Sequence, residues 1–234
     1  MWSGPRNLST AMMRSFGNRA DVAEVRDEPF YGAYLAATGK EHPMRDAVLA
    51  SQSPDWREVA RACAVGGAPG RLVYQKHMTQ HMMAHFGRDW MDEVAHVFLI
   101  RSPERVAASF AAKWEAAELE DIGFVQQAEL FDRVADRMGA APPVIDAEDV
   151  RADPEGALRR LCAALGLGFD KGMLGWPPGP RPSDGVWAAH WYRSVEASTG
   201  FSPAGPPPQQ LTGRLAALAA AARPAYERLK RHAL

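Results

Sequence analysis

The sequence predicts an α/β protein of three α/β/α layers, in which helices cover both faces of a central parallel sheet. Two observations predict it. Apolar runs typical of buried parallel strands, of which 95–100 is the clearest, alternate with segments of helical periodicity. The chain of 234 residues, 47% of them hydrophobic and 24% charged, is also long enough for one sizeable core. We therefore expect a single domain over 1–234.

The order of strands and helices follows from periodicity and from turn residues. The first half of the chain predicts a helix, a strand, a helical region broken at Ser53-Pro54 and a second strand, at 8–16, 21–25, 46–64 and 71–76. After the 95–100 strand, we expect a helix from Glu104, a long helical stretch, a short strand and a helix capped by Gly166, the last three at 118–138, 142–146 and 154–165.

The segment 175–208 is different, because it is rich in Gly and Pro and contains Trp176, Trp187 and Trp191. Aromatic residues of this kind anchor an irregular loop on a core, so we expect an ordered aromatic loop region. The chain then continues in an Ala/Leu-rich helix over 209–234, which Pro224 is expected to kink or split.

Bulk charge excludes several classes of partner. The formal net charge is −1, so no global basic field exists to hold nucleic acid or a membrane, and any anion site must be built locally. The two cysteines, Cys63 and Cys162, are far apart and indicate reduced thiols of a cytoplasmic protein. No apolar run reaches the roughly 18 residues of a membrane helix, and no secretory signal pattern begins the chain.

The stretch SGPRNLSTAMMRSF, which starts at Ser3, places a turn directly before a helix. Free N–H groups and the helix dipole favour an anion there. Arg6 adds a forked cation, and Ser9 and Thr10 add hydroxyl donors. The pattern is not a Walker A motif, because Leu8-Ser9 stands where Gly-Lys is required. An ordinary capped helix is the alternative interpretation.

A second stretch, FLIRSPERVAASF over 98–110, predicts another anion site. Arg101 ends a strong strand, at the edge where open α/β sheets bind ligands. Ser109 follows about two helical turns later, so that both side chains could hold one phosphate. The alternative is that Arg101 forms a surface salt bridge and Ser109 lies on an exposed helix face.

These two motifs resemble the 5′-phosphosulfate-binding loop and the 3′-phosphate-binding strand and helix of the sulfotransferases that use 3′-phosphoadenylyl sulfate (PAPS). VIDAEDVRADPEGALRRLCAALGLGF, over 144–169, is similar to a third segment of that family. The resemblance implies a P-loop NTPase-like fold. It also implies one sulfotransferase-like domain, with a nucleotide-binding core over 1–170, a loop region over 175–208 and a C-terminal helix over 209–234.

The resemblance further implies transfer of a sulfuryl group from PAPS to a hydroxyl or amine of a small acceptor, with no metal. Arg6 stands where the family usually has a lysine at the 5′-phosphosulfate and would stabilise the leaving phosphate. Arg101 and Ser109 match the pair that holds the 3′-phosphate. The implied nucleotide-binding loop comprises Pro5, Arg6, Asn7, Leu8, Ser9 and Thr10.

The family often carries Lys-x-His at the end of a strand, with the histidine as general base. His77 follows the 72–76 strand here, Gln75 replaces the lysine, and strand alternation points Lys76 to the other side. Glu28 is the alternative base, since partial burial would raise the pKa of its carboxyl group. The spacing of His77, His81 and His85 could also suit zinc, although no carboxylate or cysteine joins them convincingly.

The sequence departs from the family in two places. Residues 175–201 lack the family's Lys-Gly nucleotide loop and resemble a branch of sulfotransferase-like proteins, some joined to aminotransferase-like domains. Met1-Trp2 is almost all of the first strand, so either that strand is very short or the native start lies upstream. A nucleotide kinase-like phosphotransferase and a non-catalytic nucleotide-binding protein therefore remain alternatives. The acceptor and the oligomeric state, with a homodimer as one option, stay open.

Overall fold

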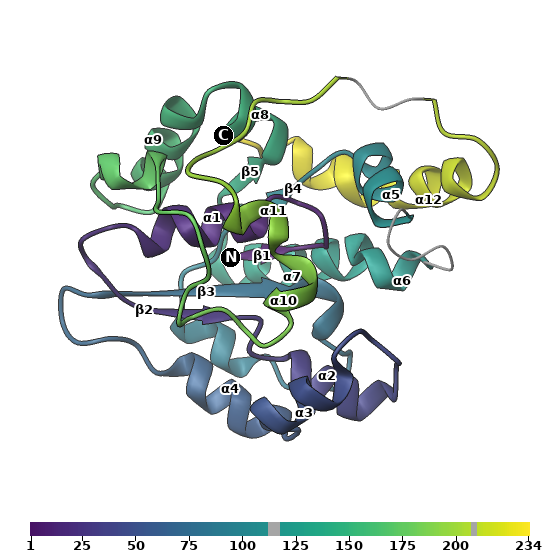
Figure 1. The fold of residues 1–234 in the computed structure, drawn as a ribbon, viewed down its shortest axis with the longest axis horizontal. Helices are drawn as coiled ribbons and strands as arrows, with labels where there is room; N and C mark the ends of the chain where they lie inside the picture. Colours follow the sequence, from purple (N-terminus) through teal and green to yellow (C-terminus); the bar gives the residue numbers. More distant parts are fainter. Residues whose placement is uncertain (112–117, 207–209) are drawn as a thin grey trace. The chain divides into compact units, whose positions relative to one another are not determined.

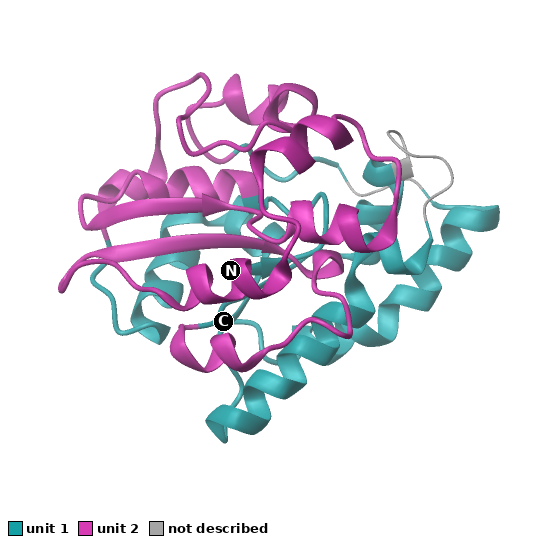
Figure 2. Cartoon of the chain, turned by 90° about the horizontal axis from the view of Figure 1, so that it is seen from below, with its two compact units in different colours: residues 1–9, 96–169, 202–234 teal, residues 10–95, 170–201 magenta. Residues whose placement is uncertain are grey.

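The computed structural model describes residues 1–111, 118–206 and 210–234. The chain divides into two compact units, each built from separate stretches of sequence (Figure 2). Unit 1 comprises residues 1–9, 96–169 and 202–234, and unit 2 comprises residues 10–95 and 170–201. Strands in both units pair in parallel and helices accompany them, which confirms the α/β class that the sequence predicts.

Unit 1 contains three parallel strands with β4 in the middle (Figure 1). Trp2 of β1 and Val144 of β5 both pair with Phe98 of β4. All residues of the three strands are buried, which explains why the 95–100 stretch is apolar without alternation. Their bounds are Trp2–Ser3 for β1, Phe98–Ile100 for β4 and Val144–Asp146 for β5.

The helices of unit 1 largely follow the predicted pattern. Gly123, with φ +70°, divides the predicted 118–138 stretch into two helices, and Pro224 lies inside a single C-terminal helix. The helix α8 was not predicted. The bounds are Pro103–Ala111 (α5), Leu119–Ile122 (α6), Phe124–Met138 (α7), Ala147–Ala152 (α8), Pro154–Ala164 (α9) and Gly213–Lys230 (α12).

An apolar cluster joins α5, α6, α7 and α12 in unit 1. Val106 and Phe110 of α5 pack with Ile122, Phe124 and Ala222, and all five are buried. The spacing of Val106 and Phe110 by four residues places both on one face of α5. This packing leaves the neighbouring face of α5, with Arg105 and Ser109, available for polar contacts.

Unit 2 is built on the parallel pair β2 and β3, in which Asp27 is paired in register with Lys76. Its elements are α1 (Ser9–Gly17, whose first residue belongs to unit 1), β2 (Val22–Asp27), α2 (Tyr31–Thr38), α3 (Arg45–Ser51), α4 (Trp56–Ala64), β3 (Leu72–Met78), η1 (Thr79–His81), η2 (Asp89–Glu93), η3 (Lys171–Leu174), α10 (Ala188–Trp191) and α11 (Arg193–Glu196).

Several predicted bounds were wrong. β3 extends through His77 to Met78, and β4 begins only at Phe98. The aromatic loop region contains two one-turn helices, α10 and α11, between its turns. Of the predicted loop region and C-terminal helix, residues 207–209 lie outside the described residues.

The structure also bears on the expectations about membrane helices and about the two cysteines. Among the residues that the structure describes, no helix combines the length and the apolar character needed to cross a membrane. Cys63 and Cys162 are both buried, and neither forms a disulfide.

Candidate functional site

The turn between β1 and α1 has an unusual backbone. Arg6 and Leu8 have φ values of +62° and +70°, while Asn7 between them does not have a positive φ. The left-handed conformation costs an L-residue about 1–2 kcal/mol. Alternation of left- and right-handed residues turns successive N–H groups toward one side and forms an anion-binding concavity. Backbone strain at two bulky residues therefore points to a ligand at this loop.

Three contacts within unit 1 hold this loop in place. Asn7 Nδ2 donates a hydrogen bond of 3.3 Å to the carbonyl of Leu99, and Arg101 Nη1 donates one of 2.9 Å to the carbonyl of Arg6. A Cβ atom at Gly4 would lie 2.5 Å from the carbonyl oxygen of Ile122, so only glycine fits there. The loop is thus hydrogen-bonded to β4 and to Arg101 just after it, and it passes close to the end of α6.

The two predicted phosphate motifs meet in unit 1. Arg6 Nε donates a hydrogen bond of 2.8 Å to Ser109 Oγ, and Arg101 braces the carbonyl of Arg6. Arg101 Nε also donates to Glu148 Oε1 at 2.9 Å, while Arg105 Nε lies 3.1 Å from Glu148 Oε2. One carboxylate therefore bridges two guanidinium groups beside the loop.

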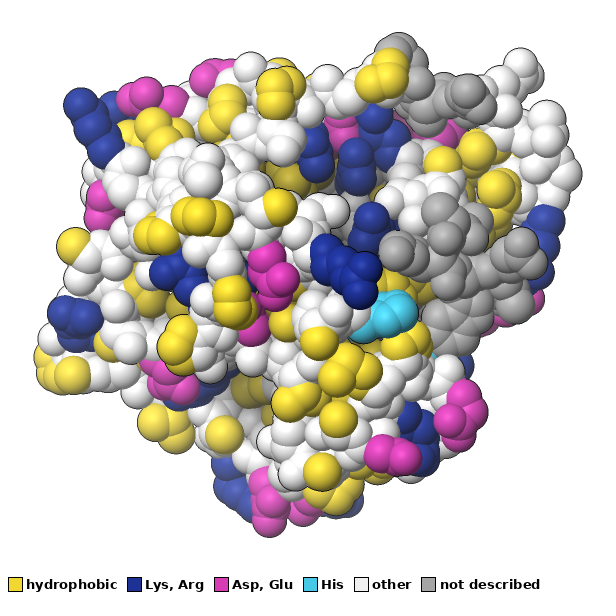
Figure 3. All heavy atoms as spheres, viewed as in Figure 1, with side chains coloured by type: hydrophobic (Ala, Val, Ile, Leu, Met, Phe, Trp, Pro, Cys, Tyr) yellow, Lys and Arg dark blue, Asp and Glu magenta, His cyan; other side chains and the backbone are white. Residues whose placement is uncertain are grey.

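The electrostatics of this region favour an anion. Burial and the nearby charge of Arg101 lower the pKa of Arg6. Burial and the charges of Arg101 and Arg105 lower the pKa of Arg151, and Glu148 opposes that effect. Arg101 and Arg105 thus share one carboxylate, while the charge of Arg101 also acts on Arg6 and Arg151, and an added anion would relieve this repulsion. Lys and Arg side chains also reach the surface in groups on the face drawn in Figure 3.

The remaining residues of the predicted loop lie in the turn before α1 or in the first turn of that helix. Pro5 and Ser9 are buried, and Leu8 is half-buried. Thr10 is the second residue of α1, is half-buried and belongs to unit 2. Ser9 and Thr10 therefore stand in the first turn of the helix, where backbone N–H groups lack intrahelical acceptors.

A buried ionic cluster lies at the ends of β2 and β3 in unit 2. Lys76 Nζ lies 2.9 Å from Asp27 Oδ1 and 2.6 Å from the hydroxyl of Tyr192, and it also donates to Glu28 Oε1. The Lys76 side chain is only 1% exposed. Two carboxylates therefore compensate one buried cation, with Tyr192 as an additional polar partner.

Glu28, the alternative predicted base, belongs to this cluster. Its φ of +43° is a left-handed conformation for a non-glycine residue. Burial raises the pKa of Glu28, Lys76 opposes that rise, and Asp27 adds to it. Its other oxygen, Oε2, lies 3.9 Å from Nδ1 of His81.

His77 lies within β3 and not after it, and its tautomer is fixed by Gln75. Gln75 Nε2 donates to the carbonyl of Cys63 at 2.8 Å, so Gln75 Oε1 faces His77 Nε2 at 3.0 Å. Since an amide oxygen only accepts, Nε2 carries the proton and Nδ1 is the basic nitrogen of the neutral ring. The rings of Phe30 and Trp90 lie 5.9 and 5.3 Å from the imidazole.

His81 is held in an aromatic sandwich. Its ring stacks on Tyr31 at 4.5 Å and on Tyr34 at 4.8 Å, and burial holds its pKa well below the usual value. His85 is exposed. Over residues 1–111, 118–206 and 210–234, no group of three or more His, Cys, Asp or Glu side chains is arranged to hold a metal ion.

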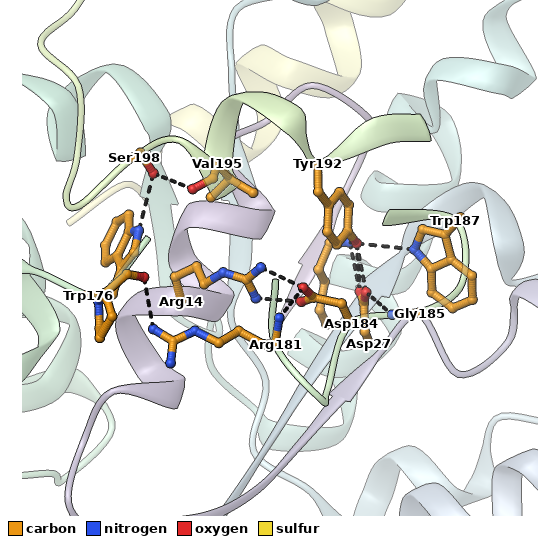
Figure 4. Close-up of polar contacts among 12 residues, drawn as sticks. Arg14, Asp27, Trp176, Arg181, Asp184, Gly185, Trp187, Tyr192, Val195 and Ser198 are labelled. Carbon is orange, nitrogen blue, oxygen red and sulfur yellow. Dashed lines mark hydrogen bonds and ion pairs between the residues drawn. The ribbon is translucent and has the colours of Figure 1, made fainter. Parts of the chain in front are cut away.

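The segment 175–201 is fastened within unit 2 by buried polar contacts (Figure 4). Arg14 pairs with Asp184 through two hydrogen bonds, of 2.5 and 2.7 Å. The amide of Gly185 donates to Asp27 Oδ2 at 3.1 Å, and the Tyr192 hydroxyl donates to the same carboxylate at 2.8 Å. These contacts place Tyr192 at the ends of β2 and β3.

Sequence reasoning did not assign a role to several residues beside the loop of unit 1, or to Tyr192 in the buried ionic cluster of unit 2. Arg105 lies inside the quoted 98–110 motif, four residues after Arg101, and Glu148 and Arg151 lie in the quoted 144–169 segment. Arg105 and Ser109 lie four residues apart within α5 and therefore on one face of that helix, which was a usable signal for Arg105. No local pattern connected Tyr192 to Lys76, because their contact spans 116 positions.

Unit 1 therefore has the features of an α/β anion-binding protein: a left-handed turn between a parallel strand and a helix, flanked by arginines. The model of the family described as "Sulfotransferase domain" matches residues 1–233. The chain belongs to this family, which supports sulfotransferase activity in general and agrees with the resemblance that the two phosphate motifs indicate.

Two curated relatives from Arabidopsis thaliana are similar to the chain. It is 39% identical over 201 residues to "Branched-chain-amino-acid aminotransferase-like protein 1" and 37% identical over 203 residues to "Branched-chain-amino-acid aminotransferase-like protein 2". Each match covers 86% of this chain but only 36% and 35% of the relative. The chain thus spans about a third of the length of these proteins.

A solved structure has a similar fold. The "Sulfotransferase Domain from the Curacin Biosynthetic Pathway" superposes with a TM-score of 0.50 and 14% identity, over 94% of this chain and 95% of that one. At this identity the likeness concerns the fold.

Proposed function

We propose that the chain transfers a sulfuryl group from PAPS to a hydroxyl or amine of a small acceptor. The observation that carries this proposal is the junction of the two phosphate motifs, in which Arg6 contacts Ser109 and Arg101 holds the carbonyl of Arg6. A donor with phosphates at both its 5′ and 3′ positions requires two adjacent anion sites. The loop and the Arg101–Ser109 pair supply two such sites.

The residues present fit this donor. The left-handed residues Arg6 and Leu8 suit a loop whose N–H groups bind the 5′-phosphosulfate, and the Arg6 side chain adds a cation. Arg101 and Ser109 suit the 3′-phosphate, since a guanidinium and a hydroxyl both donate to phosphate oxygens. When bound, PAPS supplies the activated sulfuryl group.

The residues of the chain then have separate roles. Arg6 stabilises the charge that grows on the leaving phosphate, and the loop aligns the donor for in-line transfer. His77, whose Nε2 faces Gln75 Oε1, is the general base that takes the proton of the acceptor. Glu28 is the second candidate for this step, since its strained backbone and raised pKa are typical of functional carboxylates.

Three further properties of the reaction belong to the proposed function. The acceptor is a small molecule, the reaction needs no metal, and the compartment is the cytoplasm. Sulfuryl transfer resembles phosphoryl transfer in its dependence on positioning and on electrostatic stabilisation. A protein with these residues performs it without the magnesium that a nucleotide kinase uses.

Calorimetric titration with 3′,5′-adenosine bisphosphate, without magnesium, tests the donor site. We expect micromolar binding of the bisphosphate and much weaker binding of 5′-AMP, which lacks the 3′-phosphate. Equal affinity for both nucleotides would contradict the 3′-phosphate site. Binding that appears only with magnesium would favour the kinase-like alternative.

Turnover is tested separately, by following release of 3′,5′-adenosine bisphosphate from PAPS in the presence of a panel of hydroxylated and amine acceptors. Release that depends on the acceptor supports the enzyme. Tight nucleotide binding with no turnover across the panel would instead support a non-catalytic nucleotide-binding protein.

A further inference from the structure

Glu148 occupies a special position among the arginines of unit 1. Its two carboxylate oxygens bind different guanidinium groups, with Oε1 at 2.9 Å from Arg101 Nε and Oε2 at 3.1 Å from Arg105 Nε. Within the described part of the chain, Glu148 is the one carboxylate that forms an ion pair with any of Arg6, Arg101, Arg105 and Arg151. Arg101 and Arg105 thus share a single counter-charge.

Two other carboxylates of unit 1 form ion pairs with different cations. Glu104 pairs with Arg223, and Asp149 pairs with Lys230 at 3.0 Å. These pairs keep their charge away from the four arginines. Glu148 is therefore the acidic group that an incoming anion would have to replace at Arg101 and Arg105.

Backbone carbonyls hold two of these guanidinium groups in place. Arg105 Nη2 donates to the carbonyl of Gly205 at 3.2 Å, and Arg151 Nη1 donates at 3.2 Å to the carbonyls of Ser202 and Pro203. These neutral acceptors orient the cations without cancelling their charge. The side chains also remain in contact with solvent, with 14% of Arg101, 17% of Arg105 and 25% of Glu148 exposed.

We propose that the Glu148 carboxylate is an internal substitute for a ligand phosphate, which a phosphomonoester dianion displaces from Arg101 and Arg105. This inference rests on the proposed function, in which that dianion is the 3′-phosphate of the donor. A phosphate offers more oxygens and one more negative charge than a carboxylate, so it satisfies both guanidinium groups and reaches further donors. Arg105 is then a phosphate ligand in addition to Arg101 and Ser109.

The substitution has a consequence for selectivity. An anion must compete with Glu148 for the same guanidinium groups, and a singly charged group gains little by exchanging one carboxylate for another anion of equal charge. A dianion gains an additional Coulomb attraction to the remaining arginines. Competition with Glu148 therefore lowers the affinity for singly charged anions more than for dianions, and the site favours phosphomonoesters over phosphodiesters and carboxylates.

The test compares wild type with Glu148→Gln, which preserves shape and removes the charge. The probes are inorganic phosphate and 3′,5′-adenosine bisphosphate, titrated at one ionic strength. We expect both to bind roughly tenfold more tightly to Glu148→Gln, because the competing charge is gone. Glu155→Gln, which alters an exposed helix pair with Arg159, is the matched control and should bind as wild type does.

Unchanged or weaker binding of both probes to folded Glu148→Gln would overturn the inference and would make Glu148 a residue that merely orients the arginines. Arg105→Gln provides an independent variant: we expect weaker phosphate binding, and unaltered binding would also overturn the inference. The two proposals fail differently. If the bisphosphate binds wild type but Glu148→Gln changes nothing, the inference fails alone. If phosphate responds to the charge change but no variant binds the bisphosphate, the proposed donor fails alone.

Discussion

Arg6 Nε donates a hydrogen bond of 2.8 Å to the hydroxyl of Ser109, which lies 103 positions later in the chain. The guanidinium comes from the strained loop after β1, and the hydroxyl comes from the second turn of α5. Two stretches that separately predict an anion site are therefore in contact within unit 1.

The Ser109→Ala variant should weaken binding of 3′,5′-adenosine bisphosphate. The change removes one hydroxyl that binds Arg6, and one hydrogen bond contributes about 0.5–1.5 kcal/mol, or roughly twofold to tenfold in affinity. Calorimetry measures the dissociation constant. Ser51→Ala, in an exposed position of α3, is the control and should leave it unaltered.

The Arg101→Gln variant should have a larger effect. Arg101 braces the loop through the carbonyl of Arg6 and is the proposed ligand of the 3′-phosphate. Loss of a charged hydrogen-bond donor costs roughly 1.5–3 kcal/mol of nucleotide binding. Arg159→Gln, at an exposed arginine of α9, is the matched control. Equal affinity of Arg101→Gln and wild type for the bisphosphate would reject this assignment.

The His77→Ala variant should retain nucleotide binding and lose turnover. Removal of a general base lowers the rate by about 10²-fold or more. His85→Ala removes an exposed imidazole from the same region and should retain full activity. If His77→Ala keeps its turnover while Glu28→Gln loses it, Glu28 is the base.

His81 predicts a specific pH dependence of stability. Its folded-state pKa is depressed well below 6.5 by burial, so the unfolded chain binds the proton first as the pH falls. The stability that the neutral ring provides is present above pH 6.5 and is lost as the pH drops below that value. His81→Phe preserves the stacking on Tyr31 and Tyr34 and removes this titration.

Urea unfolding at two pH values measures the effect. Between pH 6.5 and about pH 5.5, wild type should lose about 1 kcal/mol more unfolding free energy than His81→Phe. Other titrating groups are common to both proteins and cancel in this comparison. A parallel loss in both proteins would mean that His81 titrates normally in the folded state.

The Asp184→Asn variant should destabilise the protein. Arg14 and Asp184 are 2% and 5% exposed, so the substitution leaves a buried guanidinium without its counter-charge. Breaking a buried ion pair from one side costs about 3–5 kcal/mol of unfolding free energy. Urea unfolding followed by tryptophan fluorescence measures this loss. Asp136→Asn, at an exposed site in α7, should change the stability by less than about 0.5 kcal/mol.

The local parts of the site could be predicted from the sequence. The turn before α1, the strand that ends before Arg101 and the helix that carries Ser109 all follow from apolar periodicity and from Gly and Pro positions. The left-handed conformations of Arg6 and Leu8 were not predicted, because nothing in the local pattern favours them. They occur in a loop that is held by hydrogen bonds to residues more than 90 positions away.

The partners of the charged residues were determined by the tertiary structure. Strand alternation alone placed Lys76 on the face opposite His77, but only the register of β2 against β3 brings Asp27 and Glu28 to its ammonium group. Glu148 could not be assigned to Arg101 and Arg105 without the pairing of β4 with β5. Backbone preferences and periodicity act over a few neighbouring residues and can be identified in sequence. Ion pairs act over a few ångströms of space, and the fold alone determines which distant side chains meet there.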